Sequence, residues 1–190
     1  LSHPVFFLFP EEAKHCVKAL RKKAGDTIYV TDGQGHRATV QIMDASPTHC
    51  AVQIMDIEEE YALRRHSFHL AIAPTKNADR IEWLVEKSIE IGVEKISFIR
   101  CEHSERTKID LDRLQRIAIS AIKQSNTSLI PSMQITDYKS FITNHNTSTL
   151  RYIAWCDENN HEEFAHQDLK DKDVILLIGP EGDFSPEEVA

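Results

Sequence analysis

The chain has 190 residues, of which 41% are hydrophobic, and its net charge is −8. This length allows one large domain, or a small domain with a medium one, and the negative charge argues against a protein that coats nucleic acid unselectively. The four cysteines form no Cys-x-x-Cys pair and no apolar run approaches the length of a membrane span, so we expect a cytoplasmic protein with reduced thiols, no metal and no membrane contact.

Residues 1–63 have the pattern of a small β-rich unit. Alternating polar and apolar residues predict three short strands, at residues 27–30, 37–43 and 50–55. Asp32–Gly35 is typical of a hairpin turn, and Glu11–Lys23 is expected to form a short helix. Short strands this close together predict a small barrel. The acidic run at residues 58–60 is expected to be a solvated linker.

The predicted helix and the turn after it carry cations, with no acidic residue between Ala13 and Ala24. These residues, which we call the basic cluster, are Lys14, His15, Lys18, Arg21, Lys22 and Lys23. The basic cluster could follow a phosphate backbone. A solvated amphipathic helix explains the same residues about as well.

From His66 onwards, strand patterns alternate with helix patterns. Apolar runs predict four strands, at residues 68–73, 96–99, 150–156 and 174–178. One helix between them is expected to end at Gly92, and another to begin at Asp110 as its cap. Strands that alternate with helices are typical of a parallel sheet, so residues 64–190 are expected to form an α/β domain.

The loop after the last predicted strand has the pattern of a ligand site. The apolar run stops at Gly179-Pro180, and a helix begins with Ser185 as cap and Glu188 closing a capping box. Open α/β sheets place ligand sites between a strand and a helix in this way. The loop lacks the Gly-Lys-Ser/Thr and G-x-G-x-x-G patterns of nucleotide sites, and its acidic residues favour a neutral or positively charged ligand. A tight turn with good capping is about equally compatible with these residues.

Polar residues also follow two other predicted strands. Lys76 and Arg80 come after the first strand of the α/β domain, and residues 102–106 come after the second. The second group could orient a base or a phosphate. Exposed charges at a helix start also explain the first group, and propensity alone favours that explanation. Cys101-x-His103 is a weak metal pattern because no second pair lies at ligand spacing.

Five segments, in the same order, resemble the 16S ribosomal RNA uridine-N3 methyltransferases, the ribosomal RNA small subunit methyltransferase E family. They are His15–Arg21 followed by Gly25-Asp26, Lys76–Val93, Ser104–Arg106, Lys123–Ser125 with Pro131, and Ile178–Ser185. The resemblance covers essentially the whole chain. It implies a PUA-like RNA-binding β-barrel at residues 1–63 and a trefoil-knotted SPOUT methyltransferase domain at residues 64–190.

The resemblance implies S-adenosyl-L-methionine as methyl donor, a homodimer, and 16S ribosomal RNA of the small ribosomal subunit as partner and substrate. Residues that match the family's first cofactor loop are Leu177, Ile178, Gly179, Pro180, Glu181, Gly182, Asp183 and Phe184. The expected RNA-binding residues are the basic cluster together with Lys76, Arg80 and Gln124. Arg106 is expected to position the substrate, and no residue qualifies as the general base. A non-catalytic RNA-binding or ribosome-assembly factor with the same fold is the alternative.

The chain departs from the family pattern in three places. Asp183 stands where the family usually has a second glycine, and Asn126-Thr127 replace the usual Gly-Arg after Gln-Ser. The family's second cofactor motif is expected after Ala190, so the knot is not expected to close within these residues.

Overall fold

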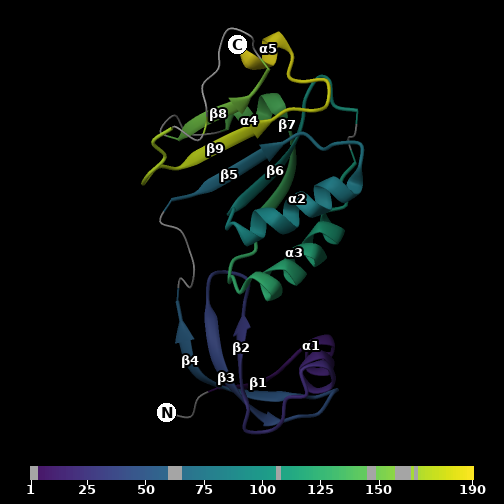
Figure 1. Ribbon diagram of the computed structural model, residues 1–190, viewed down its shortest axis with the longest axis vertical. Helices are drawn as coiled ribbons and strands as arrows, with labels where there is room; N and C mark the ends of the chain where they lie inside the picture. Colours follow the sequence, from purple (N-terminus) through teal and green to yellow (C-terminus); the bar gives the residue numbers. More distant parts are fainter. Residues whose placement is uncertain (1–3, 60–65, 106–107, 145–148, 157–163, 165–166) are drawn as a thin grey trace. The chain divides into compact units, whose positions relative to one another are not determined.

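The computed structural model describes residues 4–59, 66–105, 108–144, 149–156, 164 and 167–190. The chain folds as two compact units, Leu1–Leu63 and Arg64–Ala190 (Figure 1).

The first unit contains an antiparallel sheet with the strand order β1-β4-β3-β2. Its strands are β1 (Val5–Phe7), β2 (Thr27–Thr31), β3 (Arg37–Asp44) and β4 (Ala51–Glu58). A helical segment packs on one face of the sheet, where Ala13 and Cys16 share a buried cluster with Val40, Ile42 and Val52. Removing such side chains from water stabilises the unit by roughly 25 cal/mol for each Å² buried.

The helical segment of this unit is shorter than its sequence pattern predicts. α1 (Pro10–Lys14) continues into a π-helical turn, η1 (His15–Ala19), in which the Leu20 amide donates to the His15 carbonyl at 3.0 Å. Arg21 then adopts a left-handed conformation with φ 54°, a conformation that ends helices. The helix expected to reach Lys23 therefore ends before Arg21, and the last residues of the basic cluster lie in the following turn.

The structure of the first unit differs from the sequence pattern in two further places. The short strand β1 was not predicted, because three residues are too few to show a period. Glu58 is the last residue of β4 and not part of a linker, because it forms an ion pair with Arg37 at 2.8 Å on the neighbouring strand. The predicted hairpin turn does connect β2 to β3.

The second unit contains a parallel sheet with the strand order β7-β6-β5-β9-β8 (Figure 1). Its strands are β5 (Phe68–Ile72), β6 (Lys95–Arg100), β7 (Ser132–Asp137), β8 (Leu150–Ala154) and β9 (Val174–Ile178). The last strand in sequence, β9, pairs with both β5 and β8, so a segment from the end of the chain lies within the sheet.

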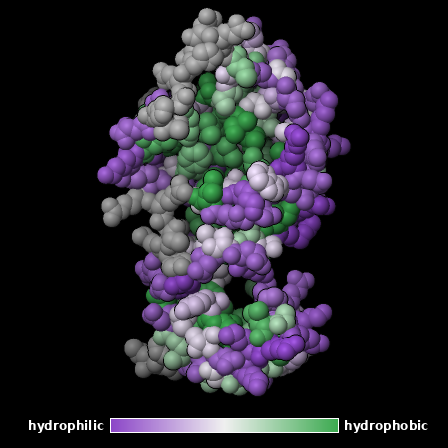
Figure 2. Space-filling view, in the orientation of Figure 1, coloured by the Kyte–Doolittle hydropathy of each residue, from purple (hydrophilic) through white to green (hydrophobic). Residues whose placement is uncertain are grey.

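Helices cover both faces of this sheet (Figure 1). α2 (Ala78–Glu90) and α3 (Leu111–Ser125) pack on one face against Leu70 and Ile72, and α4 (Tyr138–Thr143) packs on the other against Ala71. Successive side chains of a strand point to opposite faces, which explains why neighbouring residues of β5 belong to different clusters. Figure 2 shows hydrophobic side chains gathered beside α2, over β5 and β9, where Leu176 and Ile178 are only partly buried.

The sequence pattern did not predict β7 and α4. β7 is an edge strand of mostly exposed residues, so it shows no apolar run, and its alternating Met133 and Ile135 are its only strand signal. α4 begins directly after it, with the Asp137 side chain accepting from the Ser140 amide at 2.9 Å. The helix then buries Phe141 against the sheet.

Candidate functional site at the carboxyl edge of the parallel sheet

The carboxyl ends of the parallel strands lie at one edge of the second unit, so the loops that follow them meet there. Residues 73–77 follow β5, 101–105 follow β6, 155–156 follow β8, and 179–185 follow β9. We call these residues the edge loops. The loop after β9 has an edge loop on either side of it, because its strand lies between β5 and β8.

The loop after β9 turns back on itself. The Asp183 amide donates to the Pro180 carbonyl at 3.0 Å, which closes a turn. Phe184 is only 3% exposed and lies in the cluster with Ala73 and Leu177. Its ring reaches Gly179 so closely that a Cβ atom there would lie 2.9 Å from Phe184 Cδ2. Glycine at this position is therefore a packing requirement of the loop.

Asp183 adopts a left-handed conformation, with φ 61°. Glycine adopts this conformation without strain, and aspartate is one of the few other residues that tolerate it. The carboxylate of Asp183 accepts from the amides of Phe184 at 2.8 Å and Cys156 at 3.2 Å. The bond from Cys156 joins the loops after β8 and β9, and the two bonds together explain how aspartate is accommodated where a glycine was expected.

His103 connects the loop after β6 to the loop after β9. Its Nδ1 lies 3.1 Å from the Asp183 carbonyl oxygen. A Cβ atom at Gly182 would lie 3.1 Å from His103 Cβ, so the backbone of Gly182 packs tightly beneath this side chain. His103 itself is exposed.

Lys76 connects the loops after β5, β6 and β9. Its amide donates to Glu181 Oε1 at 2.9 Å, and its Nζ lies 2.5 Å from Glu105 Oε2. The hydrogen bond with Glu105 raises the pKa of Lys76, and the bond from the Lys76 amide, with smaller effects of the charges of Lys76 and Arg80, lowers the pKa of Glu181. Lys76 and Glu181 are therefore ionised at neutral pH.

Glu188 holds the short helix α5 (Pro186–Val189) to the loop after β6. Its carboxylate accepts from the amides of Glu102 at 2.9 Å and Ser185 at 3.0 Å, the latter forming half of the predicted capping box. The hydroxyl of Tyr138 donates to the Glu188 carbonyl. The Ser185 hydroxyl faces the Glu188 amide across the capping box but lies outside normal hydrogen-bond geometry. The Ser185 oxygen is therefore a buried polar atom without a hydrogen-bond partner.

Cys101 lies beneath these loops. Burial, with a smaller effect of the Glu188 charge, raises the pKa of Cys101 to about 12. The side chain is therefore a neutral thiol, which suits packing and not nucleophilic chemistry. No group of three or more His, Cys, Asp or Glu side chains that could hold a metal occurs in the described part of the chain.

The structure brings some of the predicted site residues together and separates others. The residues expected to bind cofactor lie at the end of β9 and in its loop, beside Lys76 and Arg80. Gln124 lies at the far end of α3, which leads to the start of β7 and therefore to the opposite edge of the sheet. The basic cluster belongs to the first unit, and Arg106 lies outside the described residues.

Cys156 and Tyr138 contribute to the site but were not predicted. Cys156 acts through its backbone amide, which leaves no signal in the sequence. Tyr138 opens α4, and the helix cap at Asp137 was the available signal for that helix.

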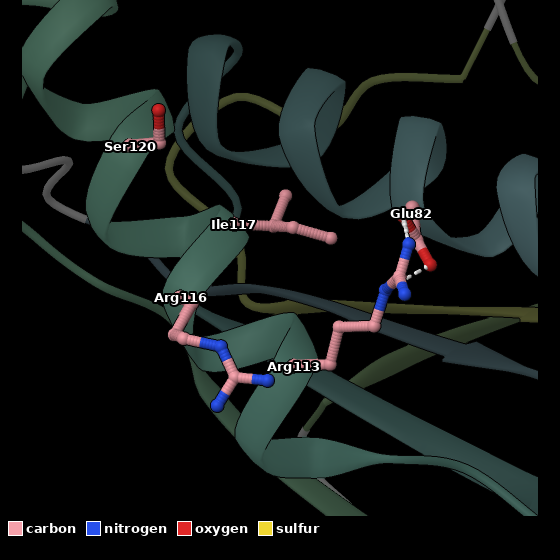
Figure 3. A pocket seen from close by; sticks show the side chains of 5 residues that line it. All are labelled: Glu82, Arg113, Arg116, Ile117 and Ser120. Atoms are coloured by element: carbon pink, nitrogen blue, oxygen red, sulfur yellow. Dashed lines mark hydrogen bonds and ion pairs between the residues drawn. The ribbon is translucent and has the colours of Figure 1, made fainter.

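A separate pocket lies between the exposed faces of α2 and α3, lined by Glu82, Arg113, Arg116, Ile117 and Ser120 (Figure 3). Arg113 Nε lies 2.6 Å from Glu82 Oε1, and this ion pair occupies one end of the pocket (Figure 3). Exposed pairs of this kind contribute little to stability. No helix among the described residues is long and apolar enough to cross a bilayer.

Residues 63–190 match the family described as an RNA methyltransferase domain, and residues 10–55 match the RNA methyltransferase PUA domain. A curated relative is the ribosomal RNA small subunit methyltransferase E of Buchnera aphidicola subsp. Acyrthosiphon pisum. It is 25% identical over 164 residues, which are 83% of this chain and 59% of the relative. The chain thus spans less than two thirds of that relative's length.

Two solved structures are also similar. One, a probable rRNA-methyltransferase from Porphyromonas gingivalis, is 40% identical with a TM-score of 0.88, and the match covers 96% of this chain and 78% of that one. The other is a putative methyltransferase from Legionella pneumophila in complex with the bound cofactor SAM. It is 26% identical with a TM-score of 0.79, over 99% of this chain and 79% of that one. The chain therefore belongs to the RNA methyltransferase family that joins a PUA domain to an α/β methyltransferase domain, as its sequence motifs indicated.

Proposed function

We propose that this protein transfers a methyl group from S-adenosyl-L-methionine to N3 of a uridine in 16S ribosomal RNA of the small ribosomal subunit. The observation that carries the proposal is the loop after β9, which three neighbouring edge loops hold through Lys76, His103 and Cys156. The family match places this loop within an RNA methyltransferase domain.

The chemistry of the loop fits the methyl donor. Glu181 and Asp183 are acidic and no cation lies among residues 179–185, so the loop is unsuited to a phosphate. The donor carries a sulfonium and an amine, both positive. Residues Leu177–Phe184 would hold it, largely through main-chain groups. When bound, the donor supplies a methyl group activated by the positive charge on sulfur.

Two sets of cations would bind the RNA. In the first unit, the basic cluster is exposed apart from the half-buried Lys22. In the second unit, Lys76 and Arg80 lie beside the loop after β9, where they would contact phosphates near the target base. Arg106 would position the uracil, which needs charge stabilisation on its oxygens as N3 loses its proton.

The test uses the full-length protein. Calorimetry should detect binding of S-adenosyl-L-methionine, and incubation with unmodified small ribosomal subunits should add one methyl group to 16S ribosomal RNA. Mass spectrometry of the digested nucleosides, with N3-, C5- and 2′-O-methyluridine standards, identifies the atom. A different methylated atom would overturn the N3 assignment. RNA binding without donor binding would instead favour a non-catalytic assembly factor.

Charge reversal tests the RNA contact. Lys14→Glu, Lys18→Glu and Arg21→Glu together should weaken RNA binding by more than about tenfold and flatten its salt dependence, with donor affinity unchanged. The matched control changes three exposed lysines of the second unit to glutamate, at positions 139, 170 and 172. An equal loss in both triple variants would contradict a specific role of the basic cluster.

The expected homodimer and trefoil knot are part of this proposal. A second copy would contact the face of α2 that carries Trp83, whose side chain is 62% exposed. Trp83→Glu should shift the full-length protein to monomer in sedimentation analysis. A variant that remains dimeric would exclude this face as the contact.

A further inference from the structure

Methylation at uracil N3 requires an acceptor for the N3 proton, because this nitrogen is protonated in a neutral base. The inference that follows rests on the proposed function. It concerns which group at the carboxyl edge of the sheet can accept that proton.

The carboxylates gathered at this edge are already engaged. Glu105 is paired with the Lys76 ammonium, and Glu181 accepts from the Lys76 amide. Asp183 accepts from two amides, and so does Glu188. Their oxygens are therefore committed to hydrogen bonds or an ion pair within the loops. The cation of Lys76 and the buried thiol of Cys101 cannot accept a proton. Of the exposed titratable side chains that remain in the described edge loops, those of Glu102, His103 and Cys156, only that of His103 is oriented by a hydrogen bond to the loop after β9.

The hydrogen bond of His103 determines which ring nitrogen is available. A carbonyl oxygen only accepts hydrogen bonds, so the 3.1 Å contact with the Asp183 carbonyl requires a proton on His103 Nδ1. In the neutral ring the lone pair then lies on Nε2. The tight contact between Gly182 and His103 Cβ limits movement of the side chain, while its exposure leaves Nε2 open to a ligand.

We propose that His103 Nε2 accepts the N3 proton of the target uracil. The proton passes from N3 to Nε2 as the lone pair of N3 attacks the methyl carbon. The nitrogen–methyl bond forms while the methyl–sulfur bond breaks, and the electron pair of that bond stays on sulfur as the positive charge is lost. The imidazolium that results is stabilised by the Asp183 carbonyl and returns its proton to water.

The variant His103→Asn tests this role. The asparagine amide can still donate to the Asp183 carbonyl, so the loop retains its contact, but no base remains. Single-turnover methyl transfer by the wild-type full-length protein should rise with pH, because the base must be unprotonated to accept the N3 proton. In His103→Asn this rise should disappear and the rate should fall roughly 10²- to 10⁴-fold, with donor affinity unchanged.

Two further measurements separate this role from a structural one. Nitrogen-detected NMR of the wild-type protein should show His103 as the Nδ1–H tautomer, and this readout needs no activity. His49→Asn, which removes an exposed imidazole of the first unit, serves as matched control and should keep both the rate and the pH profile. A His103→Asn variant with the wild-type pH profile, or an Nε2–H tautomer, would overturn the proposal while methyl transfer by the wild type still stands. No donor binding and no transfer by the wild type would overturn the proposed function and this role with it.

Discussion

Replacement of Gly179 by alanine tests the packing of the loop after β9. The new Cβ would lie 2.9 and 3.0 Å from two carbons of the Phe184 ring, whereas carbon atoms in contact prefer about 3.5–4.0 Å. The ring cannot easily move, because it is 3% exposed and packs beside Tyr138, with ring centroids 5.7 Å apart. The loop must therefore accommodate an overpacked contact.

The magnitude follows from two opposing terms. Overpacking in a well-packed core costs about 1–3 kcal/mol. The backbone of Gly179 is in a region that alanine adopts, so lower entropy of the unfolded chain returns about 0.4–1 kcal/mol. The net expectation is a loss of roughly 0.5–2 kcal/mol in the free energy of unfolding. Gly182→Ala, whose Cβ would lie 3.1 Å from His103 Cβ, should cost less because the overlap is smaller.

Urea unfolding followed by tryptophan fluorescence measures this loss. Both tryptophans, Trp83 and Trp155, lie in the second unit, so the signal reports the unit that contains the loop. In a Phe184→Leu background, where the ring edge is absent, Gly179→Ala should cost less, with a coupling of at least about 0.5 kcal/mol. An equal cost in both backgrounds, or a Gly179→Ala variant as stable as wild type, would refute the packing argument.

Three further outcomes are expected. Because Asp183 is in a left-handed conformation, Asp183→Gly should be more stable than Asp183→Ala by about 1 kcal/mol in urea unfolding, and the reverse order would contradict the conformation. The hydrogen bond from the Ser67 amide lowers the pKa of Asp173. The stability advantage of wild type over Asp173→Asn should therefore hold above about pH 5 and shrink as the pH falls through and below about 3.9, the value for unfolded aspartate; a gap that widens in acid would be inconsistent with this sign. At pH 8 an alkylating reagent should modify the exposed Cys156 first, and Cys101, whose pKa burial raises to about 12, only after unfolding; mass spectrometry of the native protein that finds Cys101 modified at a similar rate would rule this out.

The elements that the sequence pattern predicted well are those with a buried apolar period. β9 has an unbroken run of apolar residues and was expected at its observed bounds, and α3 was expected to begin at its observed cap, Asp110. β7 was not expected, because an edge strand exposes most of its side chains and shows no such run. The helix that carries the basic cluster was predicted to be too long. The composition that suggested this helix does not reveal the left-handed conformation of Arg21.

The sequence by itself determined the strand, loop and helix start around Gly179-Pro180, and with them the family. These features depend on neighbouring residues: an apolar run, a residue pair that ends the strand, and a cap three residues from its partner. Only the tertiary structure decided that His103 meets Asp183, 80 positions away, and that Cys156 meets the same residue from a third loop. The strand order places β9 between β5 and β8, so that only β5 separates it from β6. No local pattern encodes that order. The physical reason is that short-range hydrogen bonds shape each loop, whereas the pairing of distant strands selects which loops share an edge.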